Sequence, residues 1–157
     1  MIKIEMEKGG IITIELDKAA APLSAANFER LVGEGFYDGL IFHRVISGFM
    51  IQGGDPGGTG MGGSKEKIKG EFAINGHKNP LSHKRGTVSM ARSGEPNSAS
   101  SQFFICHADA TFLDGQYAAF GVVTDGMEVV DKIASARTTK PGDRPVEEQR
   151  IKRMWVE

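Results

Sequence analysis

Residues 37–54 read YDGLIFHRVISGFMIQGG, a stretch rich in β-branched and aromatic residues that ends in two glycines. Within it, residues 41–46 have the composition of a short strand. Similar runs follow at residues 87–91, 103–106 and 118–123, and the segments between them are rich in Gly, Asn, Ser and Pro. This pattern predicts several short strands joined by turns.

Strands are also predicted at both ends of the chain. Apolar residues alternate with polar ones over residues 2–6 and 12–16, and the turn-forming sequence Lys8-Gly9-Gly10 lies between them, which predicts a hairpin. Residues 151–156 form a mixed apolar run that suits a strand returning to the sheet near this hairpin.

Two helices are predicted between these strands. The first runs from Pro22, which suits a first helical position, to Val32, after which two glycines end it. The second begins near Asp125, which resembles a capping box together with Glu128. Its apolar stripe comprises Val129, Val130 and Ile133.

Many short strands and only two well-separated helices favour an all-β protein with two helices, built as an antiparallel barrel or sandwich. The 157 residues fit one domain, residues 1–157, and no repeat or linker divides them. Residues 53–83 are long, rich in glycine and weakly periodic. Loops of this length are usually functional.

Charge and cysteine content exclude several classes of protein. With 19 Lys and Arg against 20 Asp and Glu, the net charge of -1 gives no field that would attract nucleic acid or an anionic membrane. No apolar run is long enough for a membrane span, and no signal peptide is visible. Cys106 is the only cysteine, so no disulfide forms within one chain, and a cytoplasmic location is expected.

Motifs in two stretches, residues 37–54 and 89–123, together resemble the cyclophilin family. The first contains FHR, GFM and, running one residue past its end, QGGD, and the second contains SQFFI, LDG and FGVV, in the order and at the spacing of that family. The resemblance extends over nearly the whole chain. It implies a closed eight-stranded antiparallel barrel capped by two α-helices, with a peptide groove on the outer face. It also implies peptidyl-prolyl cis/trans isomerase activity that assists protein folding.

The resemblance also implies which residues form the site. Arg44 corresponds to the catalytic arginine, and Phe49 and Gln52 complete the catalytic set, with Phe49 in the proline pocket and Gln52 holding the substrate backbone. For Ala91 and Arg92 the contacts expected are largely those of the backbone. The full set of expected substrate-binding residues is His43, Met50, Ala91, Arg92, Gln102, Phe104, Phe112, Leu113 and Tyr117.

These residue types suit the chemistry. An Xaa-Pro bond resists rotation by roughly 18–20 kcal/mol because the nitrogen lone pair is delocalised into the carbonyl. In the twisted transition state the prolyl nitrogen becomes pyramidal and can accept a hydrogen bond, which a guanidinium such as that of Arg44 can donate. No metal or other cofactor is needed, since no covalent bond is made or broken.

Alternatives remain for single residues and for the whole protein. Arg44 could form a surface salt bridge, and Gln102 could serve loop geometry instead of substrate. The rival functions are a proline-peptide binding module or chaperone without catalysis, and a nucleotide-binding protein. The latter would use Gly58, Gly60 and Gly63, which match GxGxxG but lack a βαβ context.

Other motifs give no support for different chemistry. GMGGSK lacks the order of a phosphate-binding loop, and the three serines at 98, 100 and 101 form no GxSxG elbow. The four histidines, at positions 43, 77, 83 and 107, show no metal-binding spacing. We expect no metal site and a monomer that acts on proline-containing peptides and on unfolded or flexible segments.

Two positions depart from the commonest family pattern. Phe112 stands where many members carry tryptophan, and Tyr117 stands where they carry histidine, as in bacterial-type members. Because phenylalanine offers no indole N–H donor, weak cyclosporin binding is predicted. The loop ARSGEPNSASSQ is one residue longer than the commonest form, which puts loop-mediated substrate preference in doubt but not the chemistry.

Overall fold

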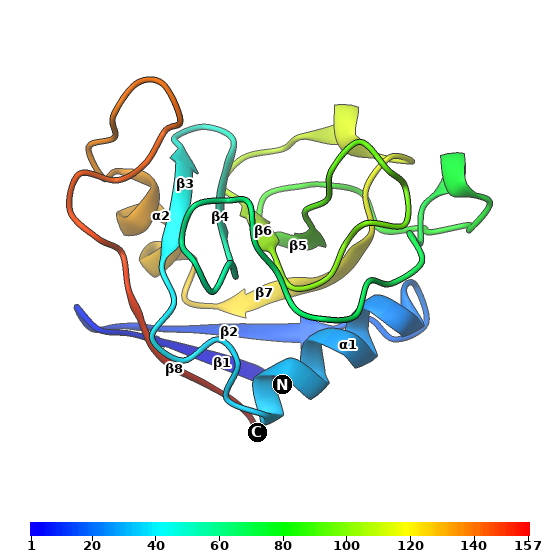
Figure 1. Ribbon diagram of the computed structural model, residues 1–157, viewed down its shortest axis with the longest axis horizontal. Coiled ribbons are helices and arrows are strands. Elements are labelled where there is room, and N and C mark those ends of the chain that lie inside the picture. The colour runs from blue at the N-terminus through cyan, green and yellow to red at the C-terminus, as the bar shows by residue number, and fades with distance from the viewer.

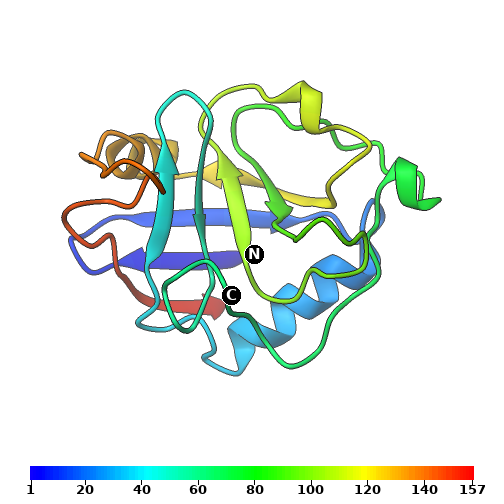
Figure 2. The same cartoon turned by 45° about the horizontal axis from the view of Figure 1, so that its top comes forward.

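The computed structural model describes residues 1–157, and eight strands form one antiparallel sheet (Figures 1 and 2). The strand order is β3-β4-β6-β5-β7-β2-β1-β8. The strands are β1 (Ile2–Met6), β2 (Ile11–Leu16), β3 (Phe42–Ile46), β4 (Met50–Gly53), β5 (Thr87–Met90), β6 (Phe103–Cys106), β7 (Ala119–Asp125) and β8 (Ile151–Val156). The helices are α1 (Pro22–Gly33) and α2 (Met127–Ala134), with two 3-10 turns, η1 (Ala73–Asn75) and η2 (Thr111–Leu113).

The sheet curls strongly, so that its two edge strands approach each other. Just before β3, Ile41 forms an isolated antiparallel bridge with Arg150, which directly precedes β8. Phe42 N donates to Gln149 O at 2.9 Å, and Ile151 N donates to Leu40 O at 2.8 Å. The expected eight-stranded antiparallel fold with two helices is confirmed, and its barrel closes through this bridge instead of a continuous ladder.

An aromatic cluster fills the space between α1 and the sheet. Phe28 of α1 is fully buried, and its ring centroid lies 5.2 Å from Tyr37, 5.1 Å from Phe103 and 5.0 Å from Phe120. Pro22 begins the helix as predicted. Its N-terminus is capped by Glu71, far along the chain, whose carboxylate accepts from Leu23 N at 3.1 Å and from Ser24 N at 2.6 Å.

Local sequence missed one strand, and one of its predictions is wrong. The residues of β4 were not predicted as a separate strand, because MIQG is too short to show a periodicity and contains a polar residue. The capping box at Asp125 is wrong: this residue ends β7, and Gly126 is the N-cap, without a side-chain hydrogen bond. Gly126 has a φ of 93°, and a Cβ there would lie 2.2 Å from Ile11 O, so the close approach of β2 requires glycine.

Candidate active site

A small apolar cavity opens on the outer face of the sheet. Its volume is about 130 Å³, and it lies over the middle of the β3-β4-β6-β5 half of the sheet. Nine residues line it, and all nine belong to the predicted site: Arg44, Phe49, Met50, Gln52, Ala91, Arg92, Phe104, Leu113 and Tyr117. A cavity of this size and apolar character suits a proline ring.

The floor of the cavity is an apolar cluster separate from the barrel core. Met50 and Phe104 are 1% and 5% exposed and pack with Cys106 and Ala110. Around this cluster lie the partly buried side chains of Phe49, Leu113 and Tyr117. The ring of Tyr117 meets that of Phe104 edge to face, with centroids 5.9 Å apart. The floor therefore rests on β4 and β6, while η2 and the chain after it form the walls.

Arg44 lies at the edge of the cavity, on β3. It pairs with Gln52 in the β3–β4 ladder, whose register shifts between Phe42 and Arg44. Such an irregularity re-aims side chains relative to a regular strand. Arg44 is exposed, and its guanidinium has no hydrogen-bond or ion-pair partner among the 157 residues. The surface salt bridge considered from sequence is therefore not formed.

Two glutamines link the cavity to the glycine-rich loop. Gln52 Nε2 donates to Gln102 Oε1 at 2.9 Å, and Gln102 Nε2 donates to Gly60 O at 2.9 Å and to Gly62 O at 2.8 Å. Gln102 thus sets loop geometry and orients Gln52. Both also line a second, more polar pocket of about 360 Å³ beside the first, so the groove continues past the apolar cavity.

The side chain of Arg92 has more contacts than the sequence suggested. Its guanidinium carbon lies 4.8 Å from the ring centroid of Phe72 and 4.8 Å from that of Tyr117. Its Nη2 donates to Gln116 O at 2.7 Å. Because Tyr117 lines the cavity, Arg92 holds one wall through cation–π contact as well as through backbone geometry.

Three predicted residues do not line the cavity, and one of them, Gln102, lines the more polar pocket beside it. His43 is buried beneath the glycine-rich loop, where its Nδ1 has no hydrogen-bond partner. Burial lowers its pKa, against the opposing charge of Asp55. Phe112 is 66% exposed at the rim, with its ring 5.6 Å from that of Phe49. Their contact with substrate stays a prediction.

The glycine-rich loop is organised around a buried carboxylate. Asp55, 1% exposed, accepts backbone hydrogen bonds from Gly57 at 2.9 Å, Thr59 at 2.9 Å and Gly60 at 2.7 Å. These N–H groups are the ones a phosphate would need, and every strand pair in the sheet is antiparallel. The GxGxxG match therefore does not form a nucleotide site.

We expect Asp55→Asn to lower the free energy of unfolding by about 2 kcal/mol at neutral pH, since its amide would face N–H donors. Burial acts to raise the pKa of Asp55, but the N–H groups of the loop outweigh it and lower the pKa from 3.8 to about 2. The unfolded chain binds the proton more readily, so this stability is present above the ordinary pKa and is lost as pH falls toward about 2. Urea unfolding at neutral pH and at about pH 3 measures it. The loss of stability in Asp55→Asn should be smaller at the lower pH, whereas Asp125→Asn, at an exposed position, should show no loss. An equal loss in Asp55→Asn at the two pH values would contradict the role given to the Asp55 carboxylate.

Three further features bear on the earlier expectations. No group of three or more His, Cys, Asp and Glu side chains is placed to hold a metal ion. No helix has both the length and the apolar character needed to cross a bilayer. Cys106 is a free, buried thiol, and burial raises its pKa to about 12, so it is unreactive.

Fold and cavity together define a protein with a curled antiparallel sheet that carries, on its outer face, an apolar cavity of the size of a proline ring. The family model of cyclophilin type peptidyl-prolyl cis-trans isomerases matches residues 1–156. The chain belongs to this family. It is a peptidyl-prolyl cis-trans isomerase and acts on proline-containing peptides.

Known relatives agree with this assignment over most of their length. The chain is 48% identical over 148 residues to peptidyl-prolyl cis-trans isomerase CYP18-1 of Arabidopsis thaliana, covering 94% of this chain and 90% of that protein. It is 46% identical over 135 residues to peptidyl-prolyl cis-trans isomerase B of Bacillus subtilis, covering 86% and 91%. A cyclophilin-type isomerase of Cryptosporidium parvum, crystallised with the dipeptide Ala-Pro, superposes with a TM-score of 0.90 at 34% identity, covering 99% of this chain and 98% of that one.

Proposed function

We propose that Arg44 lowers the rotational barrier of an Xaa-Pro bond by donating a hydrogen bond to the prolyl nitrogen in the twisted transition state. The observation that carries this proposal is an exposed guanidinium, without any partner in the protein, at the edge of an apolar cavity. In the planar ground state the nitrogen is a poor acceptor, so the interaction favours the transition state over the substrate.

The other cavity residues hold one side of the rotating bond. The proline ring enters the cavity formed by Phe49, Met50, Phe104 and Leu113, which offers it no competing polar group. Gln52, oriented by Gln102, binds the substrate backbone next to the ring. With the ring fixed, rotation moves the preceding residue along the groove.

The test compares binding with catalysis. Exchange NMR on a short Xaa-Pro peptide gives the isomerisation rate, and titration of the same peptide gives its affinity. Arg44→Ala should bind the peptide but isomerise it slowly, because the apolar side chains that seat the proline ring are unchanged. A folded Arg44→Ala protein that matches the wild-type rate would overturn the proposal.

The substrates that fit this site are exposed Xaa-Pro bonds in unfolded or flexible chains, which can lie in an open groove. We place the protein in the cytoplasm as a monomer without a cofactor. The lone buried thiol suits a reducing compartment, where disulfides are rare.

Cyclosporin should inhibit this protein weakly, because Phe112 offers no donor at the rim. Phe112→Trp should tighten inhibition about tenfold by adding one hydrogen bond. Inhibition constants for both proteins measure the effect, and Phe112→Leu is the control, which adds no donor and should not tighten inhibition. A nanomolar constant for the wild type would contradict the prediction.

A further inference from the structure

A chain of hydrogen bonds runs beneath the wall of the cavity. Asp114 Oδ1 lies 2.8 Å from His83 Nδ1, and His83 Nε2 lies 2.8 Å from Ser89 Oγ. The order is that of a serine-hydrolase triad, but Ser89 is 0% exposed and no substrate can reach its hydroxyl. This series of hydrogen bonds must therefore have a role other than nucleophilic attack.

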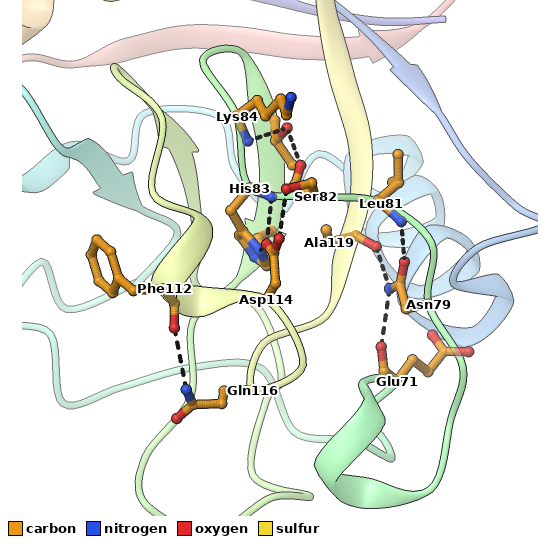
Figure 3. Close-up of polar contacts among 12 residues, drawn as sticks. Glu71, Asn79, Leu81, Ser82, His83, Lys84, Phe112, Asp114, Gln116 and Ala119 are labelled. Carbon is orange, nitrogen blue, oxygen red and sulfur yellow. Dashed lines mark hydrogen bonds and ion pairs between the residues drawn. The ribbon is translucent and has the colours of Figure 1, made fainter.

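His83 is tied to both ends of η2. Its carbonyl accepts from Ala110 N, the N-cap of η2, at 2.7 Å. Asp114, the C-cap of η2, accepts from His83 N at 2.7 Å and from Ser82 Oγ at 2.6 Å, in addition to the contact with the imidazole (Figure 3). Leu113, which lines the cavity, lies inside η2. Because His83 bonds to both caps of η2, it also fixes the wall of the cavity at Leu113.

The same imidazole supports the floor of the cavity. Its ring stacks on that of Phe104, with centroids 5.9 Å apart and planes 19° apart. Ser89, which bonds the far side of the imidazole, is the ladder partner of Phe104 between β5 and β6. Directly opposed residues on adjacent strands lie on the same face of a sheet, so His83, Ser89 and Phe104 form one packed group.

The bonding pattern fits a neutral imidazole that donates from Nδ1 to Asp114 and accepts from the Ser89 hydroxyl at Nε2. Burial lowers the pKa of His83, with Asp114 opposing this, in agreement with a neutral ring. At 1% exposure the side chain has no room to rotate. The imidazole is a rigid spacer between two parts of the cavity.

We infer that His83, fixed by Asp114 and Ser89, is a positioning residue for the proline pocket: it sets the distance between the floor at Phe104 and the wall at Leu113. This inference rests on the proposed role of the cavity but does not involve Arg44. Substitutions that remove His83 or its hydrogen bonds should weaken the binding of the proline ring and leave the transition-state hydrogen bond intact.

The test separates binding from turnover. His83→Ala and Asp114→Ala should each raise KM for an Xaa-Pro peptide about tenfold and change kcat by less than about threefold, since a small misplacement of pocket walls costs this order. Asp114→Asn keeps an acceptor for the imidazole and should restore most of the affinity. Asp114 has a 38% exposed side chain, so its variants should fold even if His83→Ala does not.

Asn79 supplies a matched control in the same chain segment. Its Nδ2 donates to Glu71 O at 3.0 Å and to Ala119 O at 2.9 Å, away from the cavity (Figure 3). Asn79→Ala should lower Tm but leave KM unchanged. KM of each variant is measured well below the midpoint of its thermal unfolding, where the protein is folded.

The outcomes distinguish this inference from the proposed function. Wild-type KM in Asp114→Ala, or a rise in Asn79→Ala as large as in Asp114→Ala, would overturn the positioning role and leave the role of Arg44 standing. A loss of kcat with unchanged KM in Asp114→Ala would also contradict it. If Arg44→Ala is fully active while Asp114→Ala raises KM, the mechanism fails and the positioning role holds.

Discussion

Arg44→Ala should lower kcat/KM for a short Xaa-Pro peptide about 100- to 1000-fold, the usual loss when one positioned transition-state donor is removed. The fall should appear in kcat, because the proline ring still enters the apolar cavity. Folding should be unaffected, since the Arg44 side chain is exposed and has no hydrogen-bond or ion-pair partner in the protein. A coupled or exchange assay gives the rate, and thermal unfolding checks the fold.

Arg44→Lys tests the geometry of the donor. Lysine keeps the charge but replaces a planar fork with a single rotatable ammonium, so it should recover only part of the rate. Arg137→Ala is the matched control, since Arg137 is an exposed arginine beside the C-terminal end of α2 and lines neither pocket of the groove. A loss in Arg137→Ala equal to that in Arg44→Ala would point to general charge instead of a positioned donor.

Phe28→Ala should lower the free energy of unfolding by about 4 kcal/mol, the middle of the range for removing a buried aromatic side chain. Phe28 contacts Tyr37, Phe103 and Phe120 in the cluster that joins α1 to the sheet, and none of its surface is exposed. For a chain of this length the loss corresponds to a fall in Tm of about 10 °C. Urea unfolding and a thermal melt measure it.

Leu23→Ala on the same helix is the control. Leu23 is 50% exposed, so its truncation should cost less than about 1 kcal/mol. The folded Phe28→Ala protein should still isomerise peptide, because the aromatic cluster lies inside the barrel and the apolar cavity lies outside it. Equal costs for the two variants would mean that α1 is not anchored through Phe28.

Local sequence predicted the elements that have a clear signature of their own. Alternation over residues 2–6 and 12–16 predicted β1 and β2, and Pro22 predicted the start of α1. Prediction from local sequence failed at positions where a contact with a distant part of the chain determines how a helix begins. Gly126 starts α2 because β2 passes against it, and Glu71 caps α1 from a loop that no helix rule connects with it.

The site divides in the same way. Read as a family pattern, FHR, GFM, QGG and SQFFI identified five of the nine cavity residues, Arg44 among them, and the rest of residues 89–117 supplied the other four. They did not identify the contacts that shape it. Three such contacts join residues that are distant in the chain: Gln102 orients Gln52, Arg92 packs on Tyr117, and His83 bonds to both ends of η2. The periodicity of the sequence carries no information about pairs of this kind.

By itself, the sequence determined which side chains are available: an arginine, an apolar set for one ring, and no competing nucleophile or metal motif. Only the tertiary structure decided that Arg44 has no partner, that the loop N–H groups belong to Asp55, and that His83 is buried between floor and wall. The physical reason is that hydrogen bonds and burial depend on which groups meet in space, whereas strand and helix periodicity depends on neighbours in the chain.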